Sequence, residues 1–104
     1  MSHEILVKTA LKRQAAFRNL RKHLKTIKET VIELDPHAEV YLFGSVAEKK
    51  HNYSSDIDIL IITNLHPAAI NSKLWKAGIK EPLEIHVQPP GKVSFFRRAR
   101  LEKV

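Results

Sequence analysis

A chain of 104 residues has room for one hydrophobic core, so the sequence predicts a single domain over residues 1–104. It has no cysteine, which excludes disulfides and thiolate metal sites, and its apolar runs are far too short to span a bilayer. We therefore expect a cytoplasmic protein that does not act at a membrane. The net charge is +7, with the basic residues concentrated in residues 1–34 and 92–104 around a weakly acidic centre. This distribution suits a cation site beside surfaces that attract polyanions or an acidic partner.

The first third of the chain has helical periodicity. Apolar residues recur at spacings of three and four over residues 4–34, and Arg13 interrupts the pattern. Asp35-Pro36 ends it, because the residue before a proline avoids the helical region. The spacing predicts a long helix over about residues 4–34, with a break near Arg13. The part from Phe17 onward is expected to pack on the core, and the earlier part to serve an interface.

The remaining elements are predicted to be short. Strands are expected at 38–43, 57–63 and 83–87, and a helix at 67–77 with Trp75 in the core. A basic helix is expected at about 94–103, with Ser94 as its N-cap and Phe95, Phe96 and Leu101 as its apolar contacts. The predicted fold class is α+β, a two-layer α/β arrangement. Its small mixed sheet of three to four strands has helices mainly on one face and leaves the other face open.

The most specific pattern in the sequence is Gly44-Ser45, followed after ten residues by Asp56-Ile57-Asp58. Side chains alternate along a strand, so Asp56 and Asp58 point to the same face at the start of an apolar strand. Two carboxylates placed in this way repel each other unless a positive charge lies between them, and a divalent cation is the natural choice. With a Gly-Ser turn beside it, the pattern predicts a metal-nucleotide site.

Gly44-Ser45, the ten-residue spacer and Asp56-x-Asp58 resemble the signature of the DNA polymerase β-like nucleotidyltransferase superfamily. The short chain is similar to the minimal nucleotidyltransferase branch of that superfamily, over a core of about residues 38–88. The resemblance implies a nucleotidyltransferase-like fold and a third carboxylate on a later strand. Glu84 is the candidate, because alternation puts it on one face of the third strand with His86 and Gln88. Its rival, Glu81, precedes a proline and lies outside that alternation.

The resemblance also implies roles for these residues. Asp56 and Asp58 are expected as metal ligands, and Glu84 as a further ligand or as the base for an incoming hydroxyl. Two Mg²⁺ ions are the expected cofactors. The expected substrate is a nucleoside triphosphate, with ATP as the first candidate. Gly44 would let the backbone approach the phosphates, and Ser45 would hydrogen-bond them together with free backbone amides.

Two features of the motif region leave alternatives open. Many members of the branch carry an arginine soon after Gly-Ser, whereas this chain has Val-Ala-Glu-Lys-Lys, so Lys49 or Lys50 either replaces it or stays solvated. His86 shares a face with Glu84, where a histidine is more often a surface or packing residue than a substrate contact. The other histidines are scattered without ligand spacing, so no zinc site is expected.

The expected function is Mg²⁺-dependent transfer of a nucleoside monophosphate from a nucleoside triphosphate to a hydroxyl of a partner protein or small acceptor. A partner, or a second copy of the chain, is expected to complete the site. Minimal nucleotidyltransferases resemble one half of modules whose other half is a helical HEPN-type protein, which implies a role as the antitoxin half. The first alternative is a non-catalytic antitoxin-like subunit that masks a helical partner. The second is a nucleic-acid-binding protein that uses the basic ends.

Overall fold

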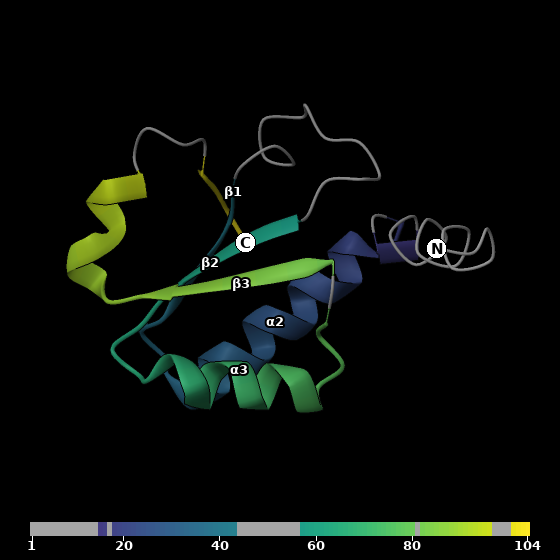
Figure 1. Ribbon diagram of the computed structural model, residues 1–104, viewed down its shortest axis with the longest axis horizontal. Helices are drawn as coiled ribbons and strands as arrows, with labels where there is room; N and C mark the ends of the chain where they lie inside the picture. Colours follow the sequence, from purple (N-terminus) through teal and green to yellow (C-terminus); the bar gives the residue numbers. More distant parts are fainter. Residues whose placement is uncertain (1–14, 17, 44–56, 81, 97–100) are drawn as a thin grey trace, which may run out of the picture.

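A computed structural model describes residues 15–16, 18–43, 57–80, 82–96 and 101–104 of the chain (Figure 1). Its four strands form one mixed sheet in the order β3-β2-β1-β4. Strand β1 pairs antiparallel with β2 and β4, and β2 pairs parallel with β3. The described elements are α2 (Leu20–Leu34), β1 (Glu39–Phe43), β2 (Ile57–Ile62), α3 (Pro67–Lys76), β3 (Leu83–Gln88), the 3-10 helix η1 (Pro90–Phe96) and β4 (Leu101–Lys103).

The predicted fold class is confirmed. Helices α2 and α3 cover the same face of the sheet, as Figure 1 shows, and the three predicted strands and the second predicted helix lie where the periodicity placed them. Strand β2 forms the centre of the core. Its residues Ile57, Ile59 and Ile61 are fully buried in one cluster with Ile27 and Val31 of α2 and with Ile70 and Leu74 of α3.

Helix α3 supplies the crossover that a parallel β2–β3 pair requires. Pro67 occupies the first turn, where its fixed φ favours the helix and its missing N–H costs nothing. The backbone N–H of Ala68 donates to Nδ1 of His66, the N-cap residue, over 3.0 Å. Gly78 ends the helix with a φ of 92°, a conformation that other residues rarely adopt. These local signals fix where the chain turns back toward β3.

The N-terminal helix is confirmed from Leu20 to Leu34, and its Leu20 and Leu24 pack on the core. Asn19 forms a turn just before α2, and its side-chain amide donates to the carbonyl of Ala15 over 3.0 Å. An asparagine that bonds the nearby backbone in this way competes with regular helix geometry. The predicted break near Arg13, and the part of the helix before Ala15, lie outside the described residues.

The predicted helix at 94–103 is wrong. Ser94 lies inside η1 instead of capping a helix, and Leu101 to Lys103 form β4, which pairs with β1 from Phe43 back to Tyr41. The backbone N–H of Val104 continues this pairing by donating to the carbonyl of Val40 over 2.9 Å. Buried strand edges need hydrogen-bond partners. This requirement of β1 outweighs the local preference of a short basic segment for a helix.

Trp75 is also not a core residue, since it is 61% exposed. One position on a helix is a rotation of about 100°, which turns Trp75 away from the core face that its neighbour Leu74 occupies. The ammonium group of Lys80 lies 4.6 Å from the centre of the indole ring.

A membrane-crossing helix would need far more apolar length than any described helix has.

The end of α2 is tied to the end of β2 by Asp35. Its carboxylate accepts a hydrogen bond from the hydroxyl of Thr63 over 2.6 Å and another from the backbone N–H of His37 over 3.0 Å. These two bonds favour the charged form and hold the pKa of Asp35 below its ordinary value of 3.8. The hydroxyl of Thr63 also accepts a bond from the backbone N–H of Leu65.

We expect Ile59→Ala to lower the free energy of unfolding by about 2–5 kcal/mol, because it leaves a cavity in the fully buried centre of the sheet. Urea denaturation measures this value. Ile32→Ala is the matched control, since it removes the same atoms from a half-exposed position on α2. Equal losses in the two variants would contradict the placement of Ile59 at the centre of the core.

We expect Thr63→Val to lower the melting temperature most near neutral pH. The folded-state pKa of Asp35 is depressed, so its contribution is present above the unfolded value of 3.8 and is lost as the pH falls through the folded value. In thermal melts, the difference in melting temperature between the wild type and the variant should therefore become smaller below pH 3.8. It should not vanish, because the bond from Leu65 does not depend on pH. Thr63→Ser keeps the hydroxyl and is the control; a pH-independent difference would contradict the role of Asp35.

Candidate functional site

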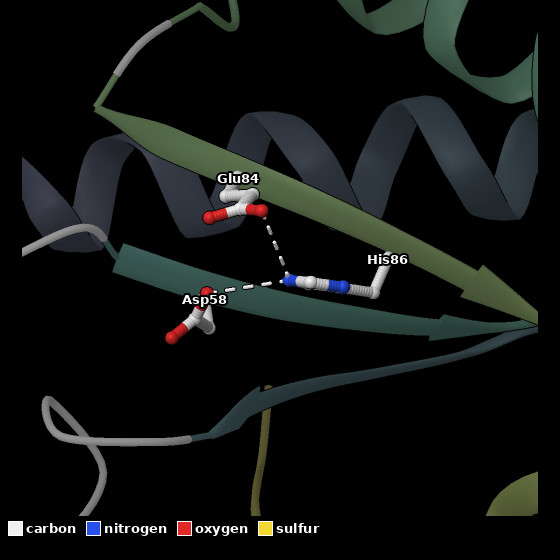
Figure 2. Close-up of side chains that lie close together, drawn as sticks. All are labelled: Asp58, Glu84 and His86. Carbon is white, nitrogen blue, oxygen red and sulfur yellow. Dashed lines mark hydrogen bonds and ion pairs between the residues drawn. The ribbon is translucent and has the colours of Figure 1, made fainter.

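Three polar side chains come together where β2 and β3 begin. The parallel register places Asp58 opposite Glu84, and His86 lies two residues further along β3. Side chains alternate along each strand, so Ile57, Ile59 and Ile61 of β2 face the helices while Asp58 faces the other side. Figure 2 shows Asp58, Glu84 and His86 gathered on that side of the two strands, with α2 behind the sheet.

The imidazole of His86 lies between the two carboxylates. Its Nε2 is 3.2 Å from Oδ1 of Asp58 and 3.8 Å from Oε1 of Glu84 (Figure 2). The side chains of Asp58, His86 and Glu84 are 27%, 35% and 54% exposed, so the cluster can be reached from solvent. Leu60 is the residue of β2 that follows Asp58 on this face, and it is fully buried. Its register partners are Tyr41 on β1 and His86 on β3. The face is thus open at Asp58 and covered further along.

Phe43 fixes the far side of the imidazole. It is the register partner of Asp58 on β1, and its ring meets that of His86 edge-on, with centroids 5.1 Å apart and planes at 74°. Phe96 of η1 contacts Phe43 in the same manner at 5.7 Å. Edge-on aromatic contacts of this kind are favourable and restrict ring orientation. The segment after β3 therefore returns to the site and braces it through Phe43.

The donor atoms of the three residues fit a divalent cation. One atom from each side chain can be chosen so that all three lie within 4.8 Å of one another. Adjacent ligands of an octahedral ion at about 2.1 Å stand about 3 Å apart, so the most widely spaced of these donors would have to approach each other by up to about 1.8 Å. Carboxylate oxygens are the donors that Mg²⁺ prefers, and Asp58 and Glu84 supply two of them.

The structure brings together two of the predicted site residues, Asp58 and Glu84, in the predicted orientation. Asp56 and the Gly44-Ser45 turn lie outside the described residues, as do Lys49 and Lys50. Sequence reasoning did not assign His86 to the metal site. The available signal was its position two residues after Glu84 on the same face of a strand, but its proximity to Asp58 depends on the pairing of β2 with β3.

The comparisons with known proteins agree with a nucleotidyl-transferring class. The chain belongs to the nucleotidyltransferase domain family, whose model matches residues 24–103. It is also similar to a provisionally assigned nucleotidyltransferase from Sulfolobus solfataricus, whose crystal structure was determined at 1.40 Å. The two share 28% sequence identity with a TM-score of 0.61, over 89% of this chain and 85% of that one. No significant match was found among curated proteins.

The family match and the structural similarity confirm the resemblance to minimal nucleotidyltransferases of the DNA polymerase β-like superfamily. The family model begins inside α2 and ends in β4. It therefore includes both strands that hold the carboxylates, and also the C-terminal strand that the sequence pattern did not predict. Family membership supports the general class of reaction, transfer of a nucleoside monophosphate from a nucleoside triphosphate.

Proposed function

We propose that the protein is a Mg²⁺-dependent nucleotidyltransferase acting on a hydroxyl of a partner protein or a small acceptor, with ATP as the nucleotide. The observation that supports this most directly is the pairing of Asp58 with Glu84 across two parallel strands, in a chain of the nucleotidyltransferase family. Nucleoside triphosphates are cytoplasmic substrates, so the proposed reaction belongs to the cytoplasm. We further propose that residues 1–104 act as one domain.

In the proposed reaction the acceptor oxygen forms a bond to the α-phosphorus, and the bond from that phosphorus to the oxygen bridging the β-phosphate breaks. The products are the nucleotidylated acceptor and pyrophosphate. Asp58 and Glu84, together with Asp56, would hold two Mg²⁺ ions, which when bound activate the acceptor hydroxyl and stabilise the leaving pyrophosphate. Glu84 is half exposed and can alternatively take the hydroxyl proton as a base. Gly44 and Ser45 are proposed to hold the phosphates.

The acceptor is proposed to be a helical partner protein of the HEPN type, which would make this chain the antitoxin half of a two-protein module. Exposed apolar side chains of the structure support a protein partner. Trp75 on α3 is 61% exposed, and Leu34 and Leu65 are each 37% exposed. Large apolar side chains, tryptophan above all, are typical anchors of protein interfaces. A second copy of the chain is the alternative occupant.

The same exposed residues favour a second candidate function, a non-catalytic subunit that masks its partner. The two candidates differ in their dependence on the carboxylates. Masking requires the exposed apolar side chains and is unaffected by Asp58→Asn, whereas nucleotidylation of the partner is lost in that variant. Masking would be favoured if a partner co-purifies with the Asp58→Asn variant and is still inhibited by it. The intact mass of that partner should then show no added nucleotide.

We expect Mg²⁺ with the correct nucleoside triphosphate to raise the melting temperature of the wild type, and Asp58→Asn to abolish the rise. Binding to the folded state alone stabilises a protein by about 2.7 kcal/mol when the ligand is at 100 times its dissociation constant. Thermal melts with each of the four nucleoside triphosphates measure the effect. Asparagine keeps the shape of aspartate and can still accept the bond from His86, so the variant should fold normally.

Glu29→Gln is the matched control, since it makes the same carboxylate-to-amide change on the exposed side of α2. It should keep the full nucleotide-dependent shift. The companion measurement is pyrophosphate release in the presence of the acceptor, which Asp58→Asn should reduce by several orders of magnitude. Unchanged turnover in Asp58→Asn would rule out Asp58 as a metal ligand and with it the proposed site.

A further inference from the structure

We infer that His86 is a nitrogen ligand of the metal site, and that the donor set Asp58–Glu84–His86 binds Mn²⁺ in preference to Mg²⁺. This inference rests on the proposed function for the existence of a metal site. The inference goes beyond the proposed function by adding a ligand of a different chemical kind and by stating that the site prefers Mn²⁺ to Mg²⁺.

The first argument is the position of Nε2. This atom is the one that approaches both carboxylates, at 3.2 Å from Oδ1 of Asp58 and 3.8 Å from Oε1 of Glu84. Adjacent ligands around an octahedral or tetrahedral ion stand about 3.0–3.5 Å apart, so the first distance lies within this range and the second exceeds it by about 0.3 Å. Without a metal this nitrogen hydrogen-bonds Asp58, so it already points toward the carboxylate oxygens that would share the ion.

The second argument is the way the ring is held. His86 stands on the same strand as Glu84 and is bound to Asp58 of the neighbouring strand, so its backbone is fixed by the sheet. Its ring is further restrained by the edge of Phe43, which Phe96 supports in turn. A ligand that is already oriented loses little conformational freedom on binding a metal. Within the described residues, this is the one group of three potential ligands close enough to share an ion.

The third argument is the chemistry of the donors. Mg²⁺ prefers oxygen and is usually held by one or two carboxylates plus water, so an imidazole adds little to its binding. Mn²⁺ occupies the same octahedral oxygen sites as Mg²⁺, and as a transition-metal ion it binds an imidazole nitrogen more readily than Mg²⁺ does. Two carboxylates with one imidazole therefore shift the balance toward the transition-metal ion. The all-oxygen pair Asp58–Glu84 alone would give a weaker preference.

The test is electron spin echo spectroscopy of the nucleotide-free protein with one equivalent of Mn²⁺. A bound imidazole couples its ¹⁴N nucleus to the electron spin of the ion, and this modulation identifies a nitrogen ligand directly. We expect the ¹⁴N modulation in the wild type and its loss in His86→Gln, whose side chain can offer only an amide oxygen to the metal. His37→Gln, which alters an exposed histidine away from the site, should keep the modulation.

Titration calorimetry gives the second readout. We expect His86→Gln to weaken Mn²⁺ binding at least about tenfold, since loss of even an outer partner of a metal ligand costs about 10–100-fold. Mg²⁺ binding should change far less. Circular dichroism and thermal melts confirm that the variant is folded, so a loss of affinity can be assigned to the ligand.

The outcomes separate this inference from the proposed function. Mn²⁺ bound without ¹⁴N modulation, or with equal affinity in wild type and His86→Gln, overturns the inference and leaves the proposed function intact. Absence of any Mn²⁺ binding without nucleotide also overturns it, and the Mg²⁺-nucleotide melts then decide the proposed function separately. Modulation lost only in His86→Gln supports the inference whether or not an acceptor has been found.

Discussion

The parallel pairing of β2 with β3 is the constraint on which both the core and the site depend. It aligns Ile57, Ile59 and Ile61 with the inward residues of β3, and the same register sets Asp58 beside Glu84 on the opposite face. The two consequences cannot be separated, because a strand has only two faces. Burial of a row of isoleucines therefore determines where the carboxylates lie. Hydrophobic packing thus sets the positions of the two carboxylates along their strands.

Such a pairing is long-range, since α3 and its flanking turns separate the two strands. The local signals that make the crossover compact are Pro67 at the start of α3 and Gly78 after its end. They shorten the path that the chain must take before β3 can pair. The site is accordingly absent from any partly folded state that lacks β3, and ligands that need all three side chains bind only the native fold.

Much of the fold could be predicted because its signals are local. Alternating apolar residues identified β1, β2 and β3, and the proline and the apolar spacing identified α3 and the second half of the N-terminal helix. The segment after β3 could not be predicted in this way. Whether Leu101 to Lys103 form a helix or a strand depends on the edge of β1 that does not pair with β2. That edge lies far away in the sequence and offers hydrogen bonds to a further strand. At the site, Glu84 could be predicted from alternation and family resemblance, whereas the proximity of His86 to Asp58 follows from pairing alone.

The two-residue period of β3 limits how this site can change during evolution. One residue inserted within the strand ahead of Glu84 would turn Glu84 and His86 toward the helices and expose Ile85 and Val87 in their place. Two inserted residues would restore the face but displace both side chains by about 6.6 Å along β2, so that Glu84 would take the place of His86 and His86 would move away from Asp58. Changes of length can therefore accumulate only in the loops. Within the strands, substitution at single positions remains the route by which related sequences can acquire a different set of ligands.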